Sequence, residues 1–320
     1  MRAVPLGRSG IDVSEFLFGA GGIGGVGASP ATRGKGLTLK QGIERLDEAW
    51  DLGIRGIDTA NSYAGGASEE AVGRWLDERQ PEDALIATKV GAPVERGQDG
   101  VDLSARHIER QLTASVRRLG RVDLYLSHAP DPGTPLAETL GAFAAALGMG
   151  IIRAYGCSNV TPWDLEAMLT TADREGLPRP EWVQNSFSLL VRGDERDLLP
   201  LVMGEGLGYT PYSPLAGGIL SDRYLGGVQP PPGSRLALAP ALYSKVFTDG
   251  ALERVAGLGS IARDFDVSTP GLALAWLRWH PQVTAPIVSP HWSGQWDAVH
   301  EALGLDLPDE DATRIGELFD

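Results

Sequence analysis

The chain has 320 residues, of which 42% are hydrophobic and 22% are charged, an ordinary globular composition that needs no metal or disulfide to support its core. Cys157 is the single cysteine, which excludes an internal disulfide and a four-cysteine zinc site and predicts a reducing, cytoplasmic compartment. The formal net charge of -14 disfavours nucleic acid and anionic membrane surfaces as partners, and neither a signal peptide nor an apolar run of about 18 residues is expected.

Short apolar runs alternate with amphipathic stretches of helical period along most of the chain. Residues 1–12 predict an N-terminal hairpin around Gly7 and Gly10. The predicted strands are "SEFLFGA", "RGID", "ALIATKV", "VDLYLSH", "IIRAYGCSN", "EWVQNS", "GLGYTPYS" and "TAPIVS". Predicted helices lie between consecutive strands, for example "GIERLDEAWDLG", "SEEAVGRWLDERQ" and "TPWDLEAMLTTADREG". Ser68, Ser104 and Thr161 stand at predicted helix starts, where a side-chain oxygen can accept from the backbone.

Successive strand ends lie about 30 residues apart, the length that a strand, a crossover helix and two loops require. Eight such units predict an α/β fold of the closed (β/α)8 TIM barrel type, forming one domain over residues 1–320. The alternative is an open, doubly wound sheet. Residues 216–250 contain "QPPPGSR" and predict a long irregular loop over the C-terminal face of the barrel.

The stretch "GAGGIG", residues 19–24, fits a G-x-G-x-x-G dinucleotide-binding turn after a strand. That interpretation requires a helix starting near Val26, whereas glycine, serine and proline residues follow there. We therefore expect a loop that lets the backbone pass close to a ligand, or a flexible loop, with a Rossmann-type dehydrogenase as a weaker alternative.

Polar side chains close several of the predicted strands. A TIM barrel gathers the C-terminal ends of its strands at one face, so these groups are expected to converge there. The set comprises Asp58, Lys89, His128, Ser158, Asn159 and Gln184. A buried ammonium needs a partner, and Asp58 is the natural partner for Lys89.

Tyr63 follows Asp58 by five residues and completes a candidate proton-transfer group. A free tyrosine has a pKa near 10, and a neighbouring ammonium is expected to lower that pKa. Tyr63 could then protonate a carbonyl oxygen while His128 orients it. The group has no hydride donor, so the chemistry requires a cofactor.

The motifs "GIDTANSY", "ATKV", "LYLSHAPDP", "GCSN", "VQNSFSLL" and "YTPYSPLAGGIL", in this order, resemble the aldo-keto reductase family over nearly the whole chain. The resemblance implies a catalytic set of Tyr63, Lys89, Asp58 and His128. It implies that Ser158, Asn159 and Gln184 hold the nicotinamide carboxamide and that Tyr212 stacks on the nicotinamide ring. It further implies coenzyme contacts from Ser213, Leu215, Gly217, Ser289, His291 and Gln295.

One segment departs from the family pattern. The family usually has a glycine and a cation after the last strand to hold the adenosine 2'-phosphate, but here His291 occupies the cation position and Val299 a position that is commonly polar. From Trp279 to Thr313 there is no lysine or arginine. NADP(H) is favoured by the resemblance, while NAD(H), a charge from Arg223 or Arg235, or adenine stacking on Trp292 or Trp296 stay open.

The expected function is reversible reduction of an aldehyde or ketone to an alcohol by an NAD(P)H-dependent oxidoreductase. The partner is then a small carbonyl compound, in a pocket lined by residues 20–36, 91–103 and 216–250. The alternative is a nicotinamide-binding regulatory or partner-binding protein of the same fold without catalysis, like the channel-associated relatives of the family. The sequence carries no signal for an oligomeric state.

Overall fold

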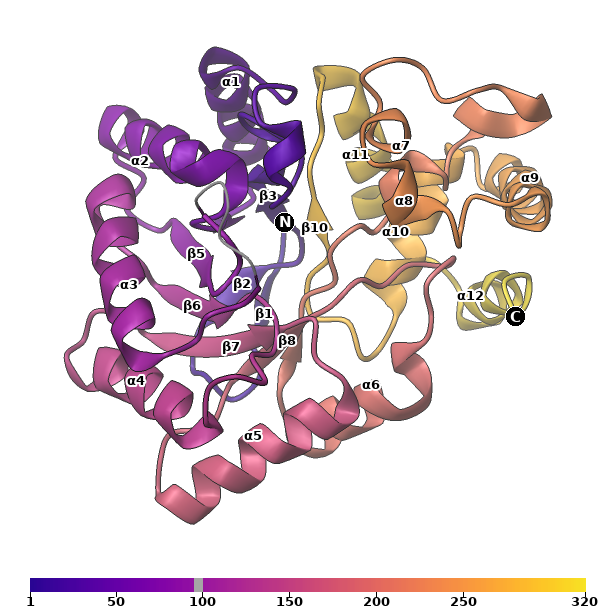
Figure 1. Cartoon of the computed structure of the whole chain (residues 1–320). Helices are drawn as coiled ribbons and strands as arrows, with labels where there is room; N and C mark the ends of the chain where they lie inside the picture. The colour runs from indigo at the N-terminus through magenta and orange to yellow at the C-terminus, as the bar shows by residue number, and fades with distance from the viewer. Residues whose placement is uncertain (95–99) are drawn as a thin grey trace.

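Eight parallel strands form one sheet in the order β10-β3-β4-β5-β6-β7-β8-β9 in a computed structural model, which describes residues 1–94 and 100–320 (Figure 1). Backbone hydrogen bonds from Thr284 N to Tyr209 O (2.8 Å) and from Ile287 N to Pro211 O (2.9 Å) join the two edges of the sheet. The strands are β3 (Leu17–Gly19), β4 (Gly56–Asp58), β5 (Leu85–Val90), β6 (Leu124–Ser127), β7 (Ala154–Ser158), β8 (Trp182–Gln184), β9 (Gly208–Tyr209) and β10 (Ile287–Val288). Because strands adjacent in sequence are adjacent in space, the predicted (β/α)8 barrel is confirmed and the doubly wound alternative, whose strand order reverses, is wrong.

The helices surround this sheet, and each of α1 to α6 packs against the next (Figure 1). Amphipathic spacing explains their orientation: α3 buries Ile108, Leu112 and Leu119, which lie four and seven residues apart. The longer helices are α1 (Leu39–Asp51), α2 (Ala67–Arg79), α3 (Ala105–Leu119), α4 (Leu136–Gly148), α5 (Pro162–Glu175), α6 (Asp194–Gly204), α9 (Asp249–Asp264), α10 (Thr269–Trp279), α11 (Asp297–Gly304) and α12 (Asp309–Glu317). Within residues 1–94 and 100–320, no helix is both long and apolar enough to cross a membrane.

The N-terminal hairpin is present, with β1 (Ala3–Pro5) antiparallel to β2 (Asp12–Ser14). Its apolar side chains Leu6, Ile11 and Val13 are buried against residues of the barrel interior such as Trp182. Gly7 has φ +57°, and a Cβ there would lie 2.5 Å from the carbonyl oxygen of Glu181. The hairpin thus covers the N-terminal end of the barrel, as predicted, and leaves the C-terminal ends of the strands for a site.

Two of the three predicted helix caps are confirmed. Ser104 accepts from His107 N, and Thr161 forms a reciprocal capping box with Asp164. The assignment of Ser68 as a cap is wrong, because α2 starts at Ala67 and the Ser68 hydroxyl donates instead to Ala20 O (2.8 Å).

The long segment after β9 is more regular than predicted. It contains the short helices η4 (Ala216–Gly218), η5 (Asp222–Gly227), α7 (Arg235–Leu238) and α8 (Pro240–Tyr243). Ser234 caps α7 and Pro240 starts α8, so both follow local rules that the proline-rich sequence before them obscured. A Cβ on Gly217 would meet the Tyr243 ring at 2.5 Å, so α8 folds back directly onto η4.

The glycine-rich stretch does not open a helix. After β3 it forms the short 3-10 turn η1 (Ala20–Gly22), and a second 3-10 turn, η2, spans Pro30–Thr32. The first α-helix, α1, starts only at Leu39, so the Rossmann-type alternative is wrong. The backbone of this stretch does pass close to a site residue, since a Cβ on Gly21 would lie 3.1 Å from the ring of Tyr63, while the predicted approach to a ligand stays a prediction.

Candidate active site

The polar residues at the strand ends lie together because the strands are parallel and in register. Asp58, the last residue of β4, pairs with Gly19 on one side and Ala87 on the other. Lys89 lies two residues beyond Ala87 in β5, and His128 directly follows β6. The topology therefore places a carboxylate, an ammonium and an imidazole at one edge of the sheet.

Lys89 is the centre of the buried polar network, with only 1% of its side chain exposed. Its Nζ donates to Asp58 Oδ2 (2.7 Å), to Thr59 O (2.8 Å) and to Tyr63 OH (3.1 Å). An ammonium has three protons, so each has one acceptor. The other oxygen of Asp58 accepts from Gln184 Nε2 (2.9 Å), which completes a buried ion pair with its hydrogen bonds satisfied.

Tyr63 lies at the start of a sharp turn that leads into α2. Ala64, Gly65 and Gly66 have φ values of +51°, +71° and +103° and lead directly into α2. Glycine adopts this left-handed region readily, whereas an alanine there is uncommon. The turn keeps the Tyr63 hydroxyl at the end of β5 instead of in solvent.

The protonation states fit proton donation by Tyr63. Burial raises the pKa of Tyr63 above its usual value, and the nearby Lys89 ammonium offsets this only in part. The expected lowering of the Tyr63 pKa is therefore wrong, because desolvation of the phenolate outweighs its attraction to Lys89. Burial opposes the charge on Lys89, but Asp58 and then Tyr63 raise the Lys89 pKa above its usual value. At neutral pH the site thus holds a phenol beside an ammonium.

His128 lies next to Tyr63, with ring centroids 5.7 Å apart and the ring planes 79° apart. Burial, together with Lys89, lowers the pKa of His128 to about 3, so the imidazole is neutral at physiological pH. Its Nδ1 lies 3.4 Å from the hydroxyl of Ser62. A neutral imidazole presents one donor and one acceptor, and the arrangement leaves Nε2 for a ligand.

A second hydrogen-bonded chain adjoins these residues at the ends of β7, β8 and β9. Asn159, with φ +57°, donates through Nδ2 to His128 O (2.8 Å) and accepts at Oδ1 from Tyr212 OH (2.7 Å). Ser158 donates to Gln184 O (2.6 Å). Ser158 and Gln184 are buried, whereas Asn159 is exposed and Tyr212 is partly exposed. Asn159 and Tyr212 are therefore the members of this chain that solvent can reach at the C-terminal end of the barrel.

The turn after β9 contains backbone N–H groups that have no acceptor among the described residues. Ser213, Ala216 and Gly217 have φ values of +55°, +47° and +71°. In the part of the chain that the structure describes, the backbone N–H groups of Ser213, Leu215 and Gly217 donate to no protein acceptor. Free backbone N–H groups can hold an anion such as a diphosphate, although these three alternate along the chain, because Pro214 has no N–H and the N–H of Ala216 donates to Ser213 O.

The segment after β10 is held by its own hydrogen bonds and by α1. His291 N donates to Gln295 Oε1 (2.6 Å), and Glu48 of α1 accepts from Ser293 Oγ (2.7 Å) and Trp296 Nε1 (2.7 Å). Ser289 lies beside His291, since a Cβ on Gly22 would meet both side chains. Burial and the charge of Arg235 lower the pKa of His291, so it is not a cation at neutral pH.

Two aromatic side chains of this segment differ in availability. Trp296 is 5% exposed and stacks on Phe18 with centroids 6.2 Å apart, so it cannot receive an adenine as the sequence analysis allowed. Trp292 is 46% exposed, and the Arg223 guanidinium lies 5.0 Å from the centroid of its ring. Val299 is buried in the core, which accounts for an apolar residue at that position.

Sequence reasoning missed the residues that support the site rather than form it. Ser62, Thr59 O and Glu48 each contact a predicted site residue or its segment. Ser62 immediately precedes Tyr63, and this position next to a predicted site residue could have indicated that Ser62 supports the site. Cys157 is buried, and burial raises the pKa of its thiol to about 12, in agreement with a packed and unreactive side chain. Residues 95–99 of the predicted pocket loop 91–103 lie outside the described residues.

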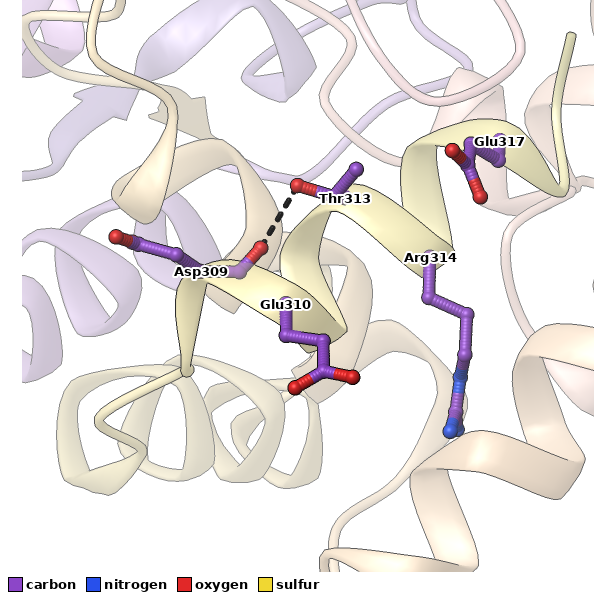
Figure 2. A pocket seen from close by; sticks show the side chains of 5 residues that line it. All are labelled: Asp309, Glu310, Thr313, Arg314 and Glu317. Atoms are coloured by element: carbon purple, nitrogen blue, oxygen red, sulfur yellow. Dashed lines mark hydrogen bonds between the residues drawn. The ribbon is translucent and has the colours of Figure 1, made fainter.

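Figure 2 shows a pocket elsewhere on the molecule, along the C-terminal helix α12, whose side chains all come from that one helix. The lining residues are Asp309, Glu310, Thr313, Arg314 and Glu317. None of them belongs to the strand-end network, so this pocket is not the candidate active site.

The polar network lies at the C-terminal end of a (β/α)8 barrel, and comparison with known proteins identifies the family. The chain belongs to the Aldo/keto reductase family, which matches residues 18–320. It is therefore an oxidoreductase enzyme, in agreement with the named reductases among its relatives.

Three relatives illustrate the range of the family. An Escherichia coli K12 protein named NADH-specific methylglyoxal reductase is 29% identical, over 99% of this chain and 98% of its own. An L-glyceraldehyde 3-phosphate reductase of the same strain is 31% identical, over 81% of this chain and 77% of its own. An Arabidopsis thaliana protein named "Probable voltage-gated potassium channel subunit beta" is 33% identical, over 88% of this chain and 85% of its own.

Proposed function

We propose that this enzyme reduces an aldehyde or ketone to the alcohol, reversibly, within one barrel domain comprising residues 1–320. The observation that carries the proposal is the contact of Lys89 Nζ with both Asp58 and Tyr63. It couples a buried ion pair to a phenol that faces the same end of the barrel. The substrate class is a small carbonyl compound, as the names of the reductase relatives suggest.

Tyr63 is the general acid in this proposal. Its hydroxyl gives its proton to the substrate oxygen, and the phenolate that forms is stabilised by Lys89, whose ammonium Asp58 holds in place. His128, neutral at physiological pH, donates a hydrogen bond to the same oxygen and orients the carbonyl. Solvent then returns the proton to Tyr63, and the sequence runs backwards in alcohol oxidation.

A nicotinamide coenzyme, when bound, supplies the hydride. Asn159 and Tyr212 face the opening and are the proposed nicotinamide contacts, with Ser158 and Gln184 behind them. The free N–H groups of Ser213, Leu215 and Gly217 are proposed to hold the diphosphate, and Ser289, His291 and Gln295 to line the adenosine end.

NADP(H) is the favoured coenzyme, with weak discrimination against NAD(H). The segment after β10 contains no cation of its own, and His291 is neutral. Arg223 over Trp292 and Arg235, whose charge reaches both Tyr63 and His291, are the available positive charges, and both come from the segment after β9. The relative named for NADH specificity keeps NAD(H) as the alternative.

Replacing Tyr63 with Phe tests the proposed function directly. We expect turnover of a reactive aldehyde such as methylglyoxal with NADPH to fall by about a hundredfold to ten-thousandfold, the usual contribution of a general acid. Binding of NADPH, followed by quenching of tryptophan fluorescence, should be retained because the phenol acts on the substrate. An unchanged rate in Tyr63→Phe would refute the assignment.

A non-catalytic, partner-binding role is the second candidate. The names of several relatives, which refer to potassium channel beta subunits, favour it. Steady-state turnover of any carbonyl by the wild-type protein with NADPH or NADH would count against this candidate, whereas coenzyme binding without turnover would support it.

A further inference from the structure

We propose that Ser62 is a positioning residue that fixes His128 in the tautomer protonated at Nε2, the form that can donate to a carbonyl oxygen. The inference rests on the proposed function, because it assigns a role to His128 in substrate binding. It concerns a side chain that does not itself reach the substrate.

The burial of Ser62 carries the first step. Ser62 is fully buried, and a buried hydroxyl is more stable when its hydrogen is donated to an acceptor. Within the described residues, His128 Nδ1 at 3.4 Å is the single hydrogen-bond partner of this hydroxyl. The geometry allows either atom to donate, and donation by the hydroxyl to Nδ1 is the direction that satisfies Ser62.

The neutrality of His128 carries the second step. Its pKa of about 3, set by burial and by Lys89, leaves one proton on the ring at physiological pH. If Nδ1 accepts from Ser62, that proton is on Nε2. The opposite tautomer would leave the Ser62 hydroxyl without an acceptor and would turn a lone pair towards the substrate oxygen.

The surroundings of His128 supply no competing control over the ring. Lys89 acts on it through its charge, the Tyr63 ring lies edge-on beside it, and Asn159 contacts its backbone oxygen only. Across residues 1–94 and 100–320, neither ring nitrogen has a hydrogen-bond partner other than Ser62. The choice of tautomer is thus left to one hydroxyl.

Ring-nitrogen chemical shifts test the inference without reference to activity. In protein labelled with 15N-histidine, we expect wild-type His128 to show a protonated Nε2 and an unprotonated Nδ1, with the signal assigned by its loss in His128→Gln. Ser62→Ala should shift the two resonances towards a mixture of tautomers, and Ser62→Thr, which keeps the hydroxyl, should restore them. Unchanged shifts in Ser62→Ala, or a wild-type His128 protonated at Nδ1, would overturn the proposal.

Kinetics give the second measurement. We expect kcat for aldehyde reduction to fall by about tenfold in Ser62→Ala, the equivalent of one hydrogen bond, with the coenzyme Kd unchanged and Ser62→Thr recovering most of the rate. Ser68→Ala is the matched control, since Ser68 is equally buried near the same loops but bonds to Ala20 and Thr59. An equal effect of both serines would mean a structural role only and would also overturn the proposal.

The two measurements separate the two proposals. If the wild-type protein turns over no carbonyl, the proposed function fails while the chemical shifts still report on Ser62. If turnover is normal and the shifts ignore Ser62, the proposed function stands and the inference fails. Should Ser62→Ala not fold, Ser62→Cys, with a weak donor of similar shape, provides the same two readouts.

Discussion

The strand-end network around Lys89 and the segment after β10 lie at the same end of the barrel but are built differently. Around Lys89 every ionised group is paired within the protein, and the ion pair with Asp58 is almost completely buried. The segment after β10 contains no lysine or arginine, and its exposed Trp292 is covered by an arginine from a different loop. The proposed proton-transfer group is thus complete within the barrel, whereas the positive charge beside Trp292 comes from the segment after β9.

Lys89→Met should have the largest effect, because it disrupts the strand-end network around Lys89 and lowers the stability of the fold. It removes the cationic partner of a buried carboxylate and leaves Asp58 with Gln184 as its remaining side-chain donor among the described residues. We expect the free energy of unfolding to fall by about 3–5 kcal/mol, measured by urea denaturation. Arg223→Ala, at an exposed position, is the control and should change stability by no more than about 0.5 kcal/mol. Equal stabilities of the two variants would show that the Lys89–Asp58 pair is not a requirement of the fold.

Arg223→Ala should have the next largest effect. It changes the surroundings of the segment after β10 and should weaken the binding of NADPH without lowering stability. If Arg223 supplies the charge for the 2'-phosphate, its loss removes a charge-assisted contact of about 1.5–3 kcal/mol, or about a tenfold to hundredfold weaker Kd for NADPH. The Kd for NADH should stay the same, because NADH lacks that phosphate. Fluorescence titration of both coenzymes measures the difference.

Arg196→Ala is the matched control for Arg223, since it also removes one exposed arginine charge, on α6. An equal loss of affinity for NADPH and NADH in Arg223→Ala would instead indicate that Arg223 contacts the diphosphate, which both coenzymes contain. In the wild-type protein, a preference for NADPH above about a hundredfold would contradict weak discrimination, because about 2.7 kcal/mol would then require a further cation.

The difference between the two regions also separates what the sequence could predict from what it could not. Asp58, Lys89 and His128 each close a predicted strand, so the parallel register alone brings them together. The direction of the Tyr63 pKa shift depended on how deeply the phenol is buried, which no spacing reveals. The contacts of Arg223 with Trp292 and of Glu48 with Trp296 join segments 69 and 248 residues apart through loop conformation, and so had no local signal.

Tyr212→Phe should have the smallest effect. It tests a residue that links the strand-end network to the proposed coenzyme site. The Tyr212 hydroxyl donates to Asn159, which in turn donates to His128 O, so the hydroxyl belongs to the barrel network while the ring belongs to the proposed coenzyme site. We expect stability to fall by about 0.5–1.5 kcal/mol, the value of one hydrogen bond, and the Kd for NADPH to change by less than about threefold.

Tyr212→Ala provides the contrast, because it also removes the ring and with it a stacking contribution of about 1–3 kcal/mol to coenzyme binding. If Tyr212→Phe weakens NADPH as much as Tyr212→Ala does, the hydroxyl and not the ring makes the coenzyme contact. The hydrogen bond from Tyr212 to Asn159 would then break when the coenzyme binds. In that case Asn159 would belong to the coenzyme site as well as to the strand-end network.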